Sequence, residues 1–205
     1  MKITWLGHAC FAVESEGWRI VLDPYTMDTY PPLHTYGNAV FCSHGHADHN
    51  YAEAVELRRG GRDSFTVETV ATFHDEKGGA LRGGNLMHIL RAEGLTVVHC
   101  GDLGHFPTEE QLAAITDADA LLIPVGGFYT IDAETAKKVA DAAKARVVVP
   151  MHYRHEPYGL RPVGTLDQFT KLCDSVRYLD GNSFTLTATE SAGVIVPKYV
   201  ENAEN

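Results

Sequence analysis

The sequence of 205 residues predicts a single α/β domain in which helices cover β-sheets. Strand-like segments come first, and strands then alternate with helices along the rest of the chain. No linker-like stretch, internal repeat or low-complexity segment interrupts this pattern. A chain of this length can bury a substantial hydrophobic core, so we expect one domain over residues 1–205.

The first half of the chain is rich in strand patterns. Lys2–Trp5 alternates like a strand, and Cys10–Glu14 with Trp18–Leu22 predicts a hairpin around Ser15-Glu16-Gly17. The segment Asp28–Asn38 contains two prolines and a glycine and predicts a loop. Further along the chain, we expect a short buried strand at Ala39–Cys42, a helix at Tyr51–Arg59, and strands at Phe65–Phe73, Leu86–Leu90 and Leu95–His99.

One loop is unusually rich in glycine. The segment Glu76–Gly84 contains Gly78, Gly79, Gly83 and Gly84. So many glycines predict either a mobile segment or a close approach of the backbone to a ligand. We expect this loop to be able to close over a substrate.

The second half alternates strands with capped helices. Thr108–Gln111 has the capping-box pattern and predicts a helix to about Ile115. Thr165–Gln168 has the same pattern and predicts a helix to about Cys173. Asp132 is the expected N-cap of a helix over Ala133–Lys144. We also expect strands at Ala120–Ile123, Arg146–Pro150, Val176–Tyr178 and Ser183–Thr187, and a frayed end over Glu201–Asn205.

The composition restricts the compartment and the partners. Hydrophobic residues make up 44% and charged residues 21%, which are ordinary globular values. No apolar run approaches the ~20 residues of a membrane span, and the N-terminus has no signal-peptide pattern, so we expect a cytoplasmic protein without a membrane partner. The formal net charge of −10 disfavours a broad nucleic-acid surface, which needs clustered Lys and Arg.

The cysteines do not predict a disulfide framework or a thiolate metal site. Cys10, Cys42, Cys100 and Cys173 are widely spaced and form no C-x-x-C pair. We expect buried, reduced thiols. Cys42 and Cys100 flank candidate site residues, but this is weak support for a redox role.

The stretch Ser43–Asn50 contains a dense group of candidate metal ligands. His44, His46, Asp48 and His49 lie within six positions. A chance group of exposed polar side chains does not explain such a cluster, whereas metal binding does. His44 and His46 are two positions apart, so their side chains point the same way in an extended chain and can share one ion. Asp48 and His49 come as the chain turns, and can point at a second ion.

Three more candidate ligands follow predicted strands: His74, Asp102 and His152. Strand ends at one edge of a layered α/β fold are where ligand sites are built, so we expect all seven candidates to converge. Imidazole and carboxylate donors suit zinc, manganese or iron. Asp102 can bridge two ions with its two oxygens, which predicts a dinuclear site, with ions ~3.5–4 Å apart and a bridging hydroxide as nucleophile. His88 and His99 compete with His74 for its role, but His88, inside a strand, is more simply explained as a structural or surface residue, and His99 as a packed one.

Four other residues are candidates for supporting roles. Asp23 either orients a ligand histidine or makes a simple Asp-Pro turn. His105 either donates a proton or hydrogen bond to the substrate or caps local backbone. His8 is a candidate for lining the site. Arg154 either binds a substrate anion or is solvated.

The motif His44-Gly45-His46-Ala47-Asp48-His49, followed by His74, Asp102 and His152, resembles the metallo-β-lactamase superfamily. The resemblance covers nearly the whole chain. Several further segments resemble the short-chain hydrolase branch that includes the L-ascorbate-6-phosphate lactonase-like proteins: Trp5–His8, Leu22–Tyr25, Gly101–His105, Leu122–Gly127 and Pro150–Tyr153.

The resemblance implies a four-layer αββα sandwich, two mixed sheets flanked by helices. It also implies a division of the ligands: His44, His46 and His74 hold one ion, Asp48, His49 and His152 hold the other, and Asp102 bridges them. His46 stands where the flavodiiron branch has Glu, which disfavours oxygen reduction. Asp102 takes the bridging role in place of the Cys of dizinc lactamases, which disfavours antibiotic hydrolysis. The chain is too short for the long arm of tRNA-processing relatives.

The sequence therefore predicts a metal-dependent hydrolase with two divalent ions, zinc first and manganese or iron as alternatives. Asp48 or Asp102 is expected to assist the transfer of the proton from the bridging water. The expected substrate is a small lactone, ester or phosphorylated metabolite, including anionic ones, and the alternative is a phosphodiester, including nucleic acid. A non-catalytic metal-binding protein is the alternative from another class. Loop composition does not name the substrate, and the sequence leaves a homo-oligomer open.

Overall fold

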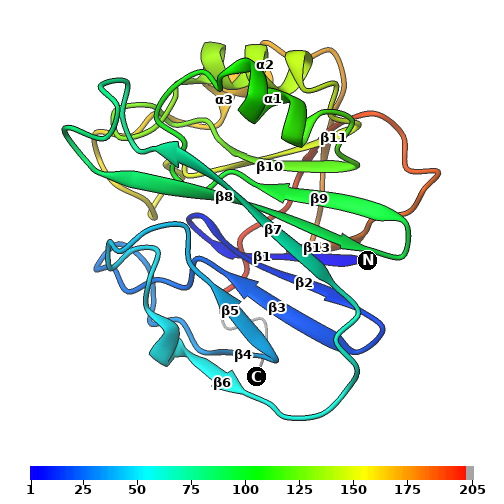
Figure 1. The fold of residues 1–205 in the computed structure, drawn as a ribbon. Helices are drawn as coiled ribbons and strands as arrows, with labels where there is room; N and C mark the ends of the chain where they lie inside the picture. The colour runs from blue at the N-terminus through cyan, green and yellow to red at the C-terminus, as the bar shows by residue number, and fades with distance from the viewer. Residues whose placement is uncertain (202–205) are drawn as a thin grey trace.

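The computed structural model describes residues 1–201, and two β-sheets packed face to face form its centre (Figure 1). A five-stranded sheet has the order β13-β1-β2-β3-β5, and a seven-stranded sheet has the order β12-β14-β11-β10-β9-β8-β7. Both sheets contain parallel and antiparallel pairs, and one large hydrophobic core lies between them. The predicted α/β sandwich of two mixed sheets is therefore confirmed.

The five-stranded sheet is built mostly from the N-terminal hairpins. Its strands are β1 (Lys2–Gly7), β2 (Cys10–Ser15), β3 (Trp18–Leu22), β5 (Ala39–Phe41) and β13 (Ser183–Thr185). Side chains alternate across the sheet: Phe11 and Val13 join the core between the sheets, whereas Cys10 and Ala12 belong to a smaller cluster on the other face. Because β3 and β5 are parallel, the residues that follow them emerge at the same edge.

The seven-stranded sheet supplies the other half of that edge. Its strands are β7 (Thr66–Phe73), β8 (Gly84–Ala92), β9 (Leu95–His99), β10 (Ala120–Pro124), β11 (Val147–Met151), β12 (Val176–Tyr178) and β14 (Gly193–Val196). The strands β9, β10 and β11 are parallel, and β7 runs the same way because β8 is antiparallel to both β7 and β9. The chain after β7, β9 and β11 therefore reaches His74, Asp102 and His152 at one edge.

The helices cover the outer face of the seven-stranded sheet, at the top of Figure 1. They are α1 (Glu109–Ile115), α2 (Ala133–Ala142) and α3 (Asp167–Thr170). The capping box at Thr108 and the N-cap at Asp132 form as predicted. Outside the five-stranded sheet, a 3-10 helix (Ala52–Ala54) and a two-stranded sheet of β4 (Thr35–Gly37) and β6 (Val55–Leu57) replace a full helical layer.

Two local predictions are wrong because tertiary pairing overrides local composition. The helix expected at Tyr51–Arg59 is only the short 3-10 turn, and Val55 then enters β6 and is buried in the outer cluster. The loop expected at Asp28–Asn38 contains β4, which is the partner of β6.

The C-terminal part also departs from the prediction. The hydroxyl of Thr165 bonds to the side chain of Asp167, so the predicted capping box does not form and α3 ends at Thr170. The strand β14 was not predicted, although its apolar run Val194–Val196 is a typical signal of a buried strand. Of the frayed end predicted at Glu201–Asn205, residues 202–205 lie outside the described part of the chain.

None of the cysteines in residues 1–201 forms a disulfide bond. Cys10 and Cys100 are buried and Cys42 and Cys173 are half-buried, which confirms the expectation of packed thiols for the first two. Burial raises the pKa of Cys42 to about 11, which disfavours a reactive thiolate near the site. Within residues 1–201, none of the helices is both long and apolar enough to span a membrane.

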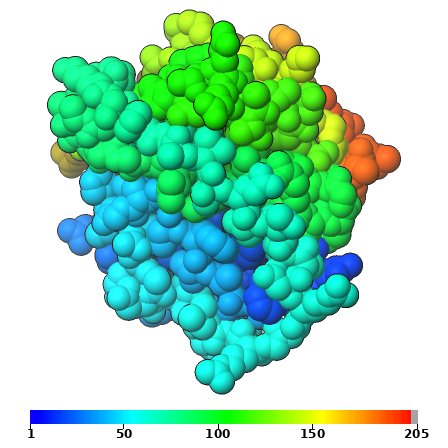
Figure 2. Space-filling model, viewed as in Figure 1, coloured from blue at the N-terminus to red at the C-terminus, as the bar shows by residue number. Residues whose placement is uncertain are grey.

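The glycine-rich loop is organised around one buried carboxylate. Asp75 accepts four backbone hydrogen bonds of 2.8–2.9 Å, from the N–H groups of Lys77, Gly79, Leu81 and Arg82. In the space-filling view the loop forms a blue-green projection at the upper left (Figure 2). Its glycines serve turn geometry, since Gly79 has φ +84° and a Cβ there would lie 2.9 Å from Phe73. The loop is thus held by a defined set of bonds.

The pKa of Asp75 follows from these contacts. Desolvation raises it, but the backbone hydrogen bonds outweigh desolvation and lower the pKa from 3.8 to about 2. The stabilisation is therefore fully present above pH 3.8 and is lost as the pH falls through about 2.

We predict that Asp75→Asn loosens this loop at neutral pH. An amide keeps one acceptor oxygen, and its NH₂ group faces two backbone donors that need an acceptor. Amide hydrogen exchange over residues 77–82 is expected to become roughly tenfold faster, with α2 unchanged. Asp63→Asn, in another loop, is the matched control, because Asp63 accepts one bond from Phe65. Unchanged exchange in Asp75→Asn would contradict this role.

Candidate metal centre

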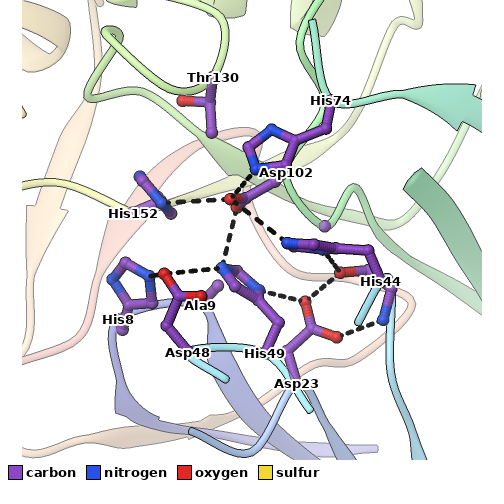
Figure 3. Close-up of polar contacts among 12 residues, drawn as sticks. His8, Ala9, Asp23, His44, Asp48, His49, His74, Asp102, Thr130 and His152 are labelled. Carbon is purple, nitrogen blue, oxygen red and sulfur yellow. Dashed lines mark hydrogen bonds and ion pairs between the residues drawn. The ribbon is translucent and has the colours of Figure 1, made fainter. Parts of the chain in front are cut away.

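The seven candidate ligands meet at the edge where the strands end. Figure 3 shows His44, Asp48, His49, His74, Asp102 and His152. Three groups of side chains place one ligand atom each within 4.8 Å of the others in the group. The groups are His44, His46 and His74; His8, Asp48, His49 and His152; and His44, His49 and Asp102. The structure thus brings together all seven residues predicted from the sequence, and it adds His8.

Asp102 lies at the centre of these groups. Its Oδ2 is 3.1 Å from His74 Nε2 and 3.4 Å from His152 Nε2, and its Oδ1 is 3.2 Å from His49 Nε2. His44 Nε2 is 4.0 Å from Oδ2. The carboxylate is almost fully buried. Burial raises the pKa of Asp102, but the charges of His152 and His49 outweigh burial and hold the pKa well below its ordinary range. Asp102 is therefore a buried anion surrounded by imidazoles.

Several donor atoms of this site lack hydrogen bonds. Buried side-chain atoms without a well-formed hydrogen bond in residues 1–201 include Asp102 Oδ1 and the Nε2 atoms of His8, His44 and His49. In His74 and His152 the unpaired atom is Nδ1, whereas Nε2 faces Asp102. Leaving a buried polar atom unpaired costs about 1–3 kcal/mol, so a cluster of such atoms calls for a common partner. A divalent cation bound by imidazole and carboxylate donors satisfies them together. The residues present therefore fit a metal site.

Asp23 and Ser43 contact the Nδ1 atoms of His49 and His44 and thereby orient the two rings. Asp23 Oδ2 lies 2.8 Å from His49 Nδ1, and Asp23 accepts 2.6 Å bonds from the backbone N–H and the hydroxyl of Ser43. Ser43 Oγ in turn lies 2.9 Å from His44 Nδ1. If each Nδ1 carries the proton, each Nε2 presents its lone pair to the site. This contact pattern matches the orienting role predicted for Asp23. Ser43 was missed, although a hydroxyl beside a ligand motif is a usable signal.

Burial and nearby charges shift the pKa values of His44 and His49 in opposite directions. Burial lowers the pKa of His44 to about 4. Burial also lowers that of His49, but the carboxylates of Asp102 and Asp23 outweigh it and raise the pKa of His49 well above its ordinary value. Asp23 itself stays ionised: burial raises its pKa, but the charges of His99 and His49 lower it to about 2. His49 is thus the imidazole most strongly held between anions.

Asn85 positions Asp102 and was not predicted. Its Oδ1 accepts a 2.8 Å bond from Asp102 N, and its Nδ2 donates to Thr72 Oγ1 and to the carbonyl of Cys100. Gly101 makes room for this contact, because it has φ +54° and a Cβ there would lie 2.3 Å from Asn85 Oδ1. Only the fold brings β8 beside the Asp102 loop, so local sequence carries no signal for Asn85.

His105 and Arg154, two of the candidates for supporting roles, have defined hydrogen-bond or ion-pair partners. Both ring nitrogens of His105 contact backbone: Nε2 accepts from Phe73 N at 3.2 Å, and Nδ1 lies 2.8 Å from the carbonyl of Phe106. This geometry favours the capping alternative over proton donation to a substrate. The guanidinium of Arg154 forms an ion pair with Glu156.

The two competing histidines are packed away from the donor groups. His99 Nε2 lies 2.8 Å from the carbonyl of Ala9, and its Nδ1 accepts from Gly101 N. His88 is buried with its ring against Phe41. Neither belongs to the groups around Asp102, which favours His74 in the predicted role.

Comparison with known proteins places the chain among metal-dependent hydrolases. A "UPF0173 metal-dependent hydrolase" of Carboxydothermus hydrogenoformans is 30% identical over 202 aligned residues, which cover 80% of this chain and 89% of that protein. A structure described as a Zn-dependent hydrolase of the metallo-beta-lactamase superfamily, from Thermotoga maritima, is 36% identical with a TM-score of 0.79. That match covers 97% of this chain and 99% of the other.

More distant structures share the fold alone. An isothiocyanate hydrolase from Delia radicum gut bacteria is 13% identical with a TM-score of 0.65, and the match covers 92% of this chain and 100% of that one.

The family described as "Beta-lactamase superfamily domain" matches residues 2–152, a span that begins before His8 and ends on His152. The match takes in more than half of the chain and all seven predicted ligands, so the chain belongs to the beta-lactamase superfamily.

Proposed function

We propose that this protein is a metal-dependent hydrolase with a dinuclear centre that acts on a small lactone, ester or phosphorylated metabolite. The observation that carries the proposal is the meeting of two donor groups at one buried carboxylate, Asp102. The hydrolase names of the relatives from Carboxydothermus and Thermotoga agree with it. The donors come from both sheets, which supports residues 1–205 acting as a single domain.

The proposed ligand sets follow the two sides of Asp102. His44, His46 and His74 form one set, and Asp48, His49 and His152 form the other. Oδ1 of Asp102 faces His49 of the second set, and Oδ2 lies near both His74 of the first set and His152 of the second set. A carboxylate in contact with both sets is suited to bridging. We propose zinc for both positions, with manganese or iron as alternatives, since imidazole and carboxylate donors suit all three.

When bound, two such ions supply a hydroxide nucleophile near neutral pH and polarise the scissile oxygen of the substrate. The chain's own residues set the proton path. Asp102 is almost fully buried, whereas the side chain of Asp48 is 27% exposed and lies 3.9 Å from His49 Nε2. Burial raises the pKa of Asp48, but the imidazoles of His8 and His49 hold it well below its ordinary range. We therefore assign proton exchange with solvent to Asp48 rather than to Asp102.

Two alternatives carry less support. A non-catalytic metal-binding protein is disfavoured because structural zinc sites are usually closed, whereas exposed His46 and partly exposed Asp48 leave this site open to solvent. A nuclease is disfavoured by the net charge of −10. The likeness to human tRNase Z, 12% identical with a TM-score of 0.55, concerns the fold alone.

The function is tested by metal analysis combined with hydrolysis assays. We expect two equivalents of zinc per chain and hydrolysis of members of a lactone and ester panel, with weaker action on bis-p-nitrophenyl phosphate. Removal of the metal with a chelator is expected to abolish turnover, and added Zn²⁺ to restore it. His34→Ala is the control, because His34 is exposed and outside the donor groups. A metal-loaded protein that hydrolyses none of these compounds would argue for the non-catalytic alternative.

We predict that Asp23→Asn weakens metal binding without removing a ligand. The amide is close in shape to the carboxylate but keeps a single acceptor oxygen for the bonds that His49 and Ser43 donate, so the contact that fixes the His49 proton on Nδ1 competes with the Ser43 bonds. Metal affinity is expected to fall about 10- to 100-fold, as measured by competition with a chromophoric chelator. Ser43→Ala keeps the Asp23–His49 contact and is expected to give a smaller loss. Equal affinities in wild type and Asp23→Asn would reject the role.

A further inference from the structure

His8 stands beside the second donor group but has no role in the proposed ligand set. It follows Gly7 at the end of β1, and its ring centroid lies 4.2 Å from that of His152 and 5.1 Å from that of His49 (Figure 3). Its exposed fraction is 2%. A buried imidazole in the middle of such a group needs a reason to be there.

The backbone holds His8 in an uncommon conformation. Its φ is 49°, in the left-handed region that non-glycine residues rarely adopt. Its carbonyl accepts one bond from Trp5 Nε1 at 3.1 Å and another from His152 N at 3.3 Å. The second bond ties the turn after β1 directly to the backbone of a proposed ligand. Strained backbone of this kind persists where the surrounding structure enforces it, and it clusters at functional sites.

The ring nitrogen of His8 is aimed at the donor group and is unpaired. Nε2 is buried without a hydrogen bond and lies 3.6 Å from Asp48 Oδ2. An N–H···O bond spans about 2.7–3.2 Å, so this separation is too long for one. Two ligand atoms at about 2.0–2.1 Å from one ion, at the angles of about 109–120° found in tetrahedral and trigonal arrangements, are separated by about 3.3–3.6 Å. The observed separation is closer to that of two ligands of one cation.

We propose that His8 is a further protein ligand of the second ion, beside Asp48, His49 and His152. This inference rests on the proposed metal centre. It makes the second position rich in imidazole, with three ring nitrogens, Asp48 and one oxygen of Asp102. Such a set favours zinc or iron over the hard cations magnesium and manganese, which prefer oxygen donors. The crowding by protein donors leaves substrate contacts chiefly to the first ion, whose ligand His46 is exposed.

A purely structural role explains the observations less well. The ring of His8 also approaches the aromatic cluster, with a centroid 6.3 Å from that of Tyr30. In the same aromatic cluster, His155 has a partner for its ring nitrogen, 3.0 Å from Tyr30 Oη. His8 Nε2 faces the metal ligands without such a partner.

The test uses a substitution that the backbone accepts. His8→Gly suits the left-handed φ, removes the donor and leaves space for free imidazole. His8→Asn is a second variant that also tolerates this φ and keeps a polar side chain. His155→Gln is the matched control, since it disturbs the aromatic packing near His8 but lies outside the donor groups. Thermal unfolding of the apo forms shows whether each variant folds.

Zn²⁺ and Co²⁺ are the probes, and binding is the readout. In both His8 variants, one of the two zinc affinities is expected to fall about 10- to 100-fold, with the visible Co²⁺ spectrum altered for that ion alone. Added imidazole is expected to restore binding to His8→Gly, while His155→Gln keeps wild-type affinities. Unchanged affinities and spectra in the folded His8 variants would overturn the proposal.

The same measurements separate this inference from the dinuclear centre. If the wild type binds one ion and His8→Gly loses it, His8 is a ligand and the dinuclear assignment fails. If the wild type binds two ions and the His8 variants keep both unchanged, the dinuclear centre stands and His8 is not a ligand. If imidazole restores nothing to a folded His8→Gly that has lost metal, the loss is structural and the ligand role is rejected.

Discussion

The negative charge of Asp102, buried against three imidazoles, is the interaction on which the site depends. Its carboxylate lies 3.1–3.4 Å from nitrogens of His49, His74 and His152 and has almost no contact with solvent. Burying a carboxylate is unfavourable unless positive charge compensates it. Protons on the histidines can do this, and so can cations. The unpaired ring nitrogens around Asp102 favour cations, because one ion satisfies several donors at once.

The fold meets this constraint with backbone direction and close packing. The strands β7, β9 and β11 run the same way in one sheet, and β3 and β5 do so in the other, so five chain segments leave the sheets at one edge. The loops there pack tightly: a Cβ on Gly104 would lie 2.2 Å from Asp75 N, next to His74. Asp75 then secures the glycine-rich loop that follows. The positions of the donors are thus set by rigid elements and by side chains one layer behind them.

Sequence reasoning found the residues whose signal is local. The spacing of His44, His46, Asp48 and His49, and the strand ends before His74 and His152, are visible in the chain itself, and the structure brings these residues together. It missed Asn85, whose contact with Asp102 exists only because β8 lies beside β9. It placed a helix at Tyr51–Arg59, where pairing with β4 draws Val55–Leu57 into a strand. Non-local pairing, which composition does not record, decides both cases.

Protons and metal ions compete for the same atoms at this site. Burial lowers the pKa of His49, yet Asp102 and Asp23 raise it well above its ordinary value, so these two carboxylates favour a proton on His49. A cation that binds Nε2 of His49 must replace the proton there, so metal binding releases a proton. The main core lies between the sheets and contains none of the donor residues. We therefore expect the sheets to stay packed without metal, in contrast to a zinc finger.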